Sequence, residues 1–384
     1  MPIKTREDLI NALVKAAELE HGLMIQYLYA EMTLKDQSDD LTPPQVTLID
    51  NWRKWIAAIA RQEMGHLAMV LNLLEAIGGG AHLDRLRLPS DEGLYTPPIR
   101  FSLDPLTLET VERFIDFETP VAPGLVPARI DVTRVGQLYT DIKTAITTHP
   151  NPADLFVGRL ANQDRSAWSF DITVMPVTDP ATAALAIDAI IVEGEGNASG
   201  HEHSHFGRFV AIREQYKQER IADPGFTPHR AVVSNPGTLD PPSPATIALT
   251  NVDTRDVAAL FNACYTTLLL VLVKYYRFDE TQENQEAVQS VARGLMILVL
   301  ARLGPLLSRL PAAAAGGPPM AGPPFEIYTL PALPHDREAS LKVLRERLAI
   351  EQAFAAALAA RVPTGGVVAR AANQLTALAS ALPS

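Results

Sequence analysis

Cysteine is nearly absent from this 384-residue chain, and positive charge is in deficit. The single cysteine, Cys264, excludes an internal disulfide and a zinc site built from several thiolates. The 33 Lys and Arg are outnumbered by 44 Asp and Glu, which argues against a nucleic-acid partner because phosphate binding requires clustered cations. Apolar runs such as 268–273 fall far short of a bilayer span, and the N-terminal residues lack the apolar core of a secretory signal. We therefore expect a cytoplasmic protein that binds neither nucleic acid nor membrane.

Strand signals are scarce as well, whereas apolar residues recur with the helical period over long stretches. The clearest helix opens at Thr42, which can cap it, with Pro43 at the first helical position and Gln45 completing a capping box. We expect it to run unbroken to the glycines that begin at Gly78, a length typical of helical bundles. Further helices are predicted over residues 7–34, 108–117, 133–148, 180–220 with an interruption at 194–200, 253–278, 283–303 (ending before Pro305) and 339–361. The sequence thus predicts an all-α protein, built on a bundle, with long proline-rich loops.

Three side chains that can bind a metal lie on apolar helical faces. Glu20 has mostly apolar neighbours at helical spacing, and burial of a lone carboxylate there would be costly without a partner or a cation. Glu63 and His66 are three residues apart, so both point the same way from the predicted helix. One Glu on one helix and a Glu-x-x-His pair on the next make half of a carboxylate-bridged dinuclear metal site. Carboxylates and imidazole without thiolate suit iron, with manganese as the alternative.

The second half of such a site is expected where the predicted helix over 180–220 is interrupted. Glu202 and His205 repeat the Glu-x-x-His spacing, and apolar residues surround His205. Glu202 has a rival role, because Ser199 and Glu202 also fit a capping box for the resumed helix. Glu193 and Glu195 precede the interruption, and the glycines on both sides of Glu195 permit the deformed helical backbone often found at functional sites.

Several of these segments resemble one known family. The runs 19–21 (Leu-Glu-His), 63–67 (Glu-Met-Gly-His-Leu) and 72–79 (Asn-Leu-Leu-Glu-Ala-Ile-Gly-Gly) are similar to its first two helices. Residues 136–139 (Gly-Gln-Leu-Tyr) resemble its Gly-Glu-x-Tyr element, and 190–196 with 204–209 resemble its Gly-Glu-Gly and His-aromatic elements. The family is the ferritin-like domain of the iminophenyl-pyruvate dimer synthases, the oxidative coupling enzymes of bisindole pathways such as that of violacein.

The resemblance implies a ferritin-like four-helix bundle with a metal centre. Gln137 stands where the family's third helix has a glutamate, and Glu202 can compensate for that missing carboxylate. An ungapped match puts the glutamate of the Gly-Glu-Gly element at Glu195, which we therefore prefer over Glu193. The predicted metal ligands are Glu20, Glu63, His66, Glu195, Glu202 and His205.

Together these features predict a diiron, O₂-dependent oxidoreductase that acts on a small, amino-acid-derived aromatic molecule in a biosynthetic pathway. The alternatives are a non-catalytic iron-binding or structural helical module, and a dimanganese enzyme that dismutates peroxide. The dimer synthases carry a large additional region without a counterpart here, so the resemblance supports the metal site more than their coupling reaction. Residues 1–220 are expected to form the metal-binding bundle, and 221–384 a helical extension packed on it. The added helices bury their apolar faces either within one subunit or against a second copy in a homo-oligomer.

Overall fold

The computed structural model describes residues 3–90, 98–120, 135–165, 168, 173–195, 203–239, 246–277, 282–363 and 366–383. The helices are α1 (Arg6–Met32), α2 (Pro43–Ala76), α3 (Leu108–Glu118), α4 (Val135–Thr147), α5 (Pro180–Glu195), α6 (His205–Ala222), α7 (Val252–Tyr276), α8 (Gln282–Gly294), α9 (Ala301–Leu307), α10 (Arg337–Arg361) and α11 (Val367–Ala381), with short 3₁₀ turns at Pro152–Leu155 and Leu160–Asn162. Two-residue strands β1 (Pro236–Gly237) and β2 (Ile247–Ala248) pair in parallel. The all-α prediction is confirmed.

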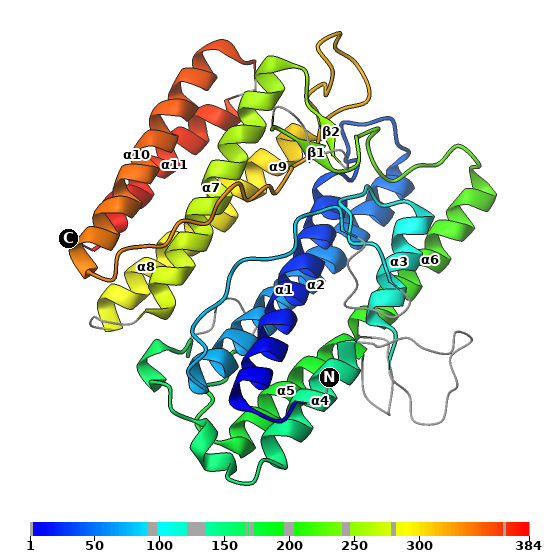
Figure 1. The fold of residues 1–384 in the computed structure, drawn as a ribbon. Coiled ribbons are helices and arrows are strands. Elements are labelled where there is room, and N and C mark those ends of the chain that lie inside the picture. The colour runs from blue at the N-terminus through cyan, green and yellow to red at the C-terminus, as the bar shows by residue number, and fades with distance from the viewer. Residues whose placement is uncertain are drawn as a thin grey trace.

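The two longest N-terminal helices, α1 and α2, pack against each other along the centre of the molecule (Figure 1). The start of α2 has the predicted chemistry: Thr42 is the N-cap, its capping box with Gln45 is formed, and Pro43 occupies the first helical position. After α2 the backbone turns at Gly78, whose φ of 83° lies in the left-handed region that glycine adopts without strain.

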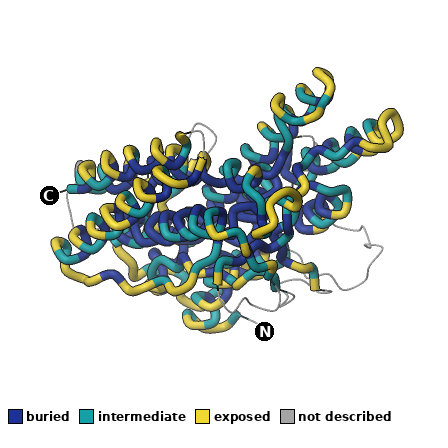
Figure 2. The backbone as a smooth tube through the Cα atoms, turned by 90° about the horizontal axis from the view of Figure 1, so that it is seen from above, coloured by how far each residue is buried: buried dark blue, intermediate teal, exposed yellow. Residues whose placement is uncertain are grey.

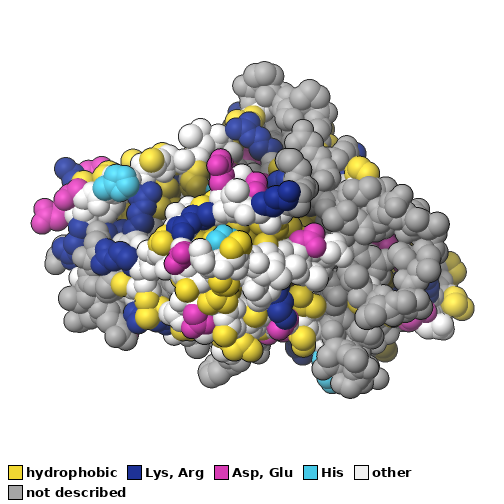
Figure 3. Space-filling view, turned by 60° about the horizontal axis from the view of Figure 1, so that its bottom comes forward, with side chains coloured by type: hydrophobic (Ala, Val, Ile, Leu, Met, Phe, Trp, Pro, Cys, Tyr) yellow, Lys and Arg dark blue, Asp and Glu magenta, His cyan; other side chains and the backbone are white. Residues whose placement is uncertain are grey.

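The remaining helices lie on two sides of the α1–α2 pair. On one side α3 packs against α6 and α4 against α5, and on the other α10 packs against α7 and α11 (Figure 1). Figure 2 shows buried backbone through the middle of the molecule and exposed backbone mainly along its periphery. On the face in Figure 3, apolar, acidic and basic side chains are interspersed over the described residues. The arrangement covers α1 and α2 on both sides, and their side chains contribute to two hydrophobic cores.

One of these cores contains residues from Leu9 to Leu382, so it joins α1 and α2 to the C-terminal helices. The other is built from α1, α2, α3 and α6, with the aromatic rings of Trp52, Phe114 and Phe209 among its members. Packing between the two predicted segments is therefore extensive. The division of the chain at residue 220 stays a prediction.

Two breaks in the helices differ from the sequence-based expectation. The helix that resumes after α5 begins at His205, and its N-cap is Ser204, whose Oγ accepts a hydrogen bond from the backbone N–H of Gly207 at 3.1 Å. The described helix thus begins later than the predicted capping box at 199–202, and those four residues lie outside the described part of the chain.

The second difference concerns Pro305, which lies inside α9 instead of ending the preceding helix. Between α8 and α9 the segment Leu295–Leu300 winds as a π-helix. The change from π to α winding interrupts the regular hydrogen-bond ladder, and a proline is tolerated at such an interruption.

Two stretches, Val252–Tyr276 and Asn284–Leu307, are long and apolar enough to cross a membrane by length and composition. In the most apolar window of the first, 72% of the residues are buried inside the protein, and in that of the second 50%. Buried core helices meet the same criterion, so these stretches are weak evidence for a membrane span.

Candidate metal centre

Glu63 lies between two imidazole rings. Its Oε2 is 3.0 Å from Nδ1 of His66, one turn further along α2, and its Oε1 is 2.9 Å from Nδ1 of His205, the first residue of α6. The two ring centroids are 5.5 Å apart. A carboxylate that presents one oxygen to each of two nitrogen ligands has the arrangement of a bridging ligand between two metal positions.

The first position is formed by Glu20, Glu63 and His66, which are all buried and offer ligand atoms within 4.8 Å of one another. Oε2 of Glu20 is 3.7 Å from Nδ1 of His66. The hydroxyl of Tyr139, from α4, donates a hydrogen bond to the other oxygen of Glu20. Tyr139 therefore fixes the orientation of the Glu20 carboxylate, whose Oε2 faces His66.

The second position is formed by Glu63, Glu118 and His205, again within 4.8 Å of one another and buried. Nδ1 of His205 is 3.6 Å from Oε2 of Glu118. The Tyr27 hydroxyl donates a 2.5 Å hydrogen bond to Oε1 of Glu118, so the two positions have the same design, with a tyrosine holding the outer carboxylate.

The second position lies where two helices end. Glu118 is the last residue of α3 and His205 the first of α6, so two short helices point one terminus each at the cluster. A small cavity of about 20 Å³ adjoins the cluster and is lined by Gly136 near the start of α4 and Gly194 near the end of α5. That volume has room for about one water-sized ligand beside the metal positions.

The electrostatics of the cluster indicate that it requires positive charge. Burial and the neighbouring Glu63 carboxylate raise the pKa of Glu20 to about 8, and the same two causes raise the pKa of Glu118. Burial alone would raise the pKa of Glu63 and lower that of His205. Glu63 instead has its pKa held well below the usual range by His205 and His66, and the two carboxylates raise the pKa of His205 to about 9. Protons thus offset the buried negative charge, as a bound cation would.

His205 provides the test of whether a metal fits. Its side chain is fully buried, and neither ring nitrogen makes a hydrogen bond within the described residues, although Nδ1 lies 2.9 Å from Glu63. A buried imidazole normally has both ring nitrogens hydrogen-bonded. Here Nδ1 approaches Glu63 closely without the alignment of a hydrogen bond, as metal ligands do when their lone pairs converge on one point. The donor set of carboxylates and imidazoles suits iron or manganese.

Of the six predicted ligands, the structure brings four together: Glu20, Glu63, His66 and His205. The side chain of Glu195 and the whole of Glu202 lie outside the described residues, so their assignments stay predictions.

Glu193, which we ranked below Glu195, has Oε2 3.1 Å from Nε2 of His66. Its side chain is 38% exposed, so it reaches the cluster from the solvent side.

Glu118 was not among the predicted ligands. Gln137, which matches the family's glutamate, donates a hydrogen bond to Asp141 at the surface. Glu118 supplies a carboxylate to the second position. The sequence does indicate the burial of Glu118, because Val111, Phe114 and Ile115 place it on the apolar face of its short helix.

A family model for ferritin-like proteins matches residues 13–214, which contain all of these ligands. The chain belongs to the ferritin-like family. It is 27% identical over 376 residues to dichlorochromopyrrolate synthase of Lentzea aerocolonigenes, a match covering 86% of this chain and 37% of that protein. It is also 27% identical over 363 residues to 2-imino-3-(indol-3-yl)propanoate dimerase of Chromobacterium violaceum, covering 84% and 34%.

The predicted resemblance is therefore confirmed, while the chain spans only about a third of the length of these curated relatives. Among solved structures, a ferritin-like protein from Caulobacter vibrioides matches 77% of this chain and 96% of its own, with a TM-score of 0.50 and 20% identity. The likeness to this solved structure supports the fold alone.

Proposed function

We propose that this chain is a metal-dependent oxidoreductase with a dinuclear, most simply diiron, centre that uses O₂ to oxidise a small molecule. The observation that carries the proposal is the position of Glu63, shared between two buried groups that each add a histidine and a carboxylate. When bound, a pair of redox-active ions supplies the electrons that reduce O₂.

The residues of the chain would hold and protect that chemistry. Tyr139 and Tyr27 orient the outer carboxylates through hydrogen bonds, so the ligands are arranged before a metal binds. Leu23, Phe117 and Ile190 line the small cavity beside the cluster and limit the access of bulk water. Loss of protons from Glu20 and His205 accompanies metal binding, because the ligands bind as a carboxylate and a neutral imidazole.

We further propose that the substrate is an amino-acid-derived aromatic molecule of a biosynthetic pathway. The support is the similarity to two enzymes whose names specify a chlorinated chromopyrrolate product and an indole-bearing imino acid. Because the chain covers only about a third of those proteins, the coupling of two such molecules is not part of the proposal.

The test is the metal content of the purified protein after anaerobic loading with ferrous iron or manganese, measured by elemental mass spectrometry. The variant Glu63→Ala/His66→Ala removes the shared carboxylate and one imidazole. The matched control Glu18→Ala/His82→Ala removes another Glu–His pair, 3.1 Å apart, from outside the cluster.

We expect about two ions per wild-type chain, retained in the control and lost in the cluster variant. Iron-dependent O₂ consumption with indole-3-pyruvate or its imine would then support the oxidoreductase. Absence of transition metal after loading would overturn it in favour of a structural module. Manganese with peroxide dismutation, and no O₂ uptake, would favour the dimanganese alternative.

A further inference from the structure

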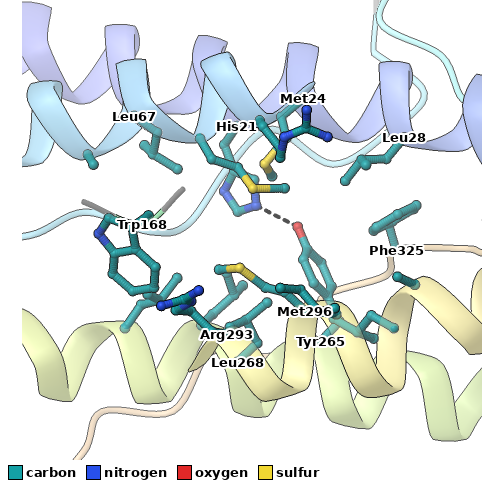
Figure 4. Close-up of a pocket in the computed structure, with 18 of the residues that line it drawn as sticks. His21, Met24, Leu28, Leu67, Trp168, Tyr265, Leu268, Arg293, Met296 and Phe325 are labelled. Atoms are coloured by element: carbon teal, nitrogen blue, oxygen red, sulfur yellow. Dashed lines mark hydrogen bonds between the residues drawn. The ribbon is translucent and has the colours of Figure 1, made fainter. Parts of the chain in front are cut away.

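A cavity of about 370 Å³ lies on the opposite side of α1 and α2 from the metal cluster. Figure 4 shows it between the α1–α2 pair and the C-terminal helices, with Met24 and Leu67 on one wall and Leu268 and Met296 on the other. Protein interiors rarely leave voids larger than a water molecule, and this volume is within the range of sites for small organic ligands.

The polar groups of this cavity are few and have distinct places. Nε2 of His21 and the hydroxyl of Tyr265 are 2.5 Å apart in the middle of the cavity. Arg85 donates a hydrogen bond to the same hydroxyl at 3.4 Å. The centre of the cavity therefore offers a pair of hydrogen-bonding side chains, with a guanidinium beside the hydroxyl.

Among the described residues that line the cavity, the charged ones are Arg61, Arg293 and Glu31. Glu31 is already paired with Arg53, with its Oε1 3.6 Å from the guanidinium. Arg293 is exposed at the rim and lies at the same end of the cavity as Trp168 (Figure 4). The balance is positive, so the cavity matches a ligand with one negative charge.

Parts of the wall are held in place by contacts that leave the space open. Asp164 accepts hydrogen bonds from the indole N–H of Trp168 and, at 2.6 Å, from the hydroxyl of Tyr275. The rim residues Met296 and Ile297 belong to the π-helical segment, and such segments occur frequently at functional sites. Ile297 is 53% exposed, so the π-helical segment presents an apolar side chain at the rim.

We propose that this cavity binds an apolar monocarboxylate, with the carboxylate at Arg293 and the apolar body between the two helical walls. A ligand that also carries an N–H group can donate it to the hydroxyl oxygen of Tyr265. The site is independent of the proposed metal chemistry, since its lining contains none of the cluster residues.

Isothermal titration calorimetry on the metal-free full chain tests the proposal with two pairs of probes, each matched in its apolar body. Decanoate is compared with decylamine, and indole-3-propionate with tryptamine. We expect at least one acid to bind about tenfold more tightly than its amine, and the ranking of the two acids distinguishes an aliphatic from an aromatic ligand. Failure of both acids to bind, or equal binding of acid and amine, would overturn the proposal.

Two variants test the location. Arg293→Gln is expected to weaken binding of the acid about tenfold, and Arg302→Gln, an exposed residue that does not line the cavity, is expected to leave it unchanged. Leu272→Trp places a larger side chain on a half-buried part of the wall and should abolish binding. Retention of wild-type affinity by both Arg293→Gln and a folded Leu272→Trp would show that the acids bind elsewhere.

Discussion

The carboxylate of Glu63 faces two imidazoles, and this one residue connects two otherwise separate sets of ligands. Its oxygens lie 3.0 Å from His66 and 2.9 Å from His205, while Glu20 and Glu118 belong to one set each. Removal of an outer carboxylate therefore affects one set, and removal of Glu63 affects both. The outer residues are for this reason the more informative targets for counting ions.

Glu118→Ala is expected to reduce the metal content after anaerobic loading by about half, because only the second metal position, formed by Glu63, Glu118 and His205, loses a ligand. Elemental mass spectrometry measures the ratio of metal to chain. Gln137→Ala is the control, since the Gln137 side chain bonds to Asp141 at the surface. A loss of metal from the Gln137 variant with none from the Glu118 variant would contradict the assignment.

Ligands within long, strongly periodic helices were predictable from sequence, whereas of the two at helix ends His205 was predicted and Glu118 was missed. Glu20, Glu63 and His66 lie within α1 and α2, where apolar neighbours at fixed spacing indicate burial. Glu118 ends an eleven-residue helix, and its approach to the cluster depends on how α3 packs against α6. Spacing along the chain carries no information on that tertiary packing.

At the scale of elements, the ends of short helices fix the geometry of the site. Ser204 accepts a hydrogen bond from the backbone of Gly207 and begins α6 one residue before His205. An N-cap of this kind contributes about 1 kcal/mol to stability and sets the direction in which the helix starts.

Ser204→Ala is therefore expected to lower the free energy of unfolding by about 1 kcal/mol and to weaken metal binding, whereas Ser204→Asp keeps the cap. Denaturant titration and a metal competition assay measure the two effects. Wild-type values for Ser204→Ala in both assays would show that the cap does not position His205.

The contact between α7 and α10 contains a buried carboxyl group. Thr267 donates a 2.5 Å hydrogen bond to Glu351, and burial raises the pKa of Glu351 from 4.5 to about 7. In the unfolded chain this carboxyl ionises near 4.5, and in the folded protein only near 7. Stability is thus lost as the pH rises from about 4.5 to 7, and it changes no further above that pH.

Glu351→Gln removes this dependence, so its free energy of unfolding relative to wild type should increase by about 2–3 kcal/mol between pH 5 and pH 8. Urea denaturation at both pH values measures the difference. Glu346→Gln, on the exposed side of the same helix, should show no such change. A pH-independent difference for Glu351→Gln would indicate that the carboxyl stays ionised throughout this range.

For the whole molecule, α1 and α2 form a wall with the metal cluster on one face and the apolar cavity on the other. The fold class and most helix positions followed from sequence periodicity. The cavity could not be predicted from periodicity, because it is formed between the α1–α2 pair and helices that follow more than 170 residues later. Its residues read from sequence as ordinary core.

Metal binding should stabilise the folded chain as a unit, because the ligands come from four helices. At free ferrous iron about one hundredfold above the dissociation constant, we expect the melting temperature to rise by about 3 °C. Anaerobic differential scanning calorimetry measures the shift. The Glu63→Ala/His66→Ala variant should show none, and an equal rise in that variant would place the stabilising ion elsewhere.

The order of the ligands along the chain also affects how the cluster is completed during protein synthesis. The ligands of the first set are all translated by the time α2 emerges, but the second set waits for His205. At ordinary rates of translation this interval is on the order of 10 s. A nascent chain thus carries three of its five ligands, and four once α3 is complete, with Glu63 still lacking its second histidine while the ribosome continues through α4 and α5.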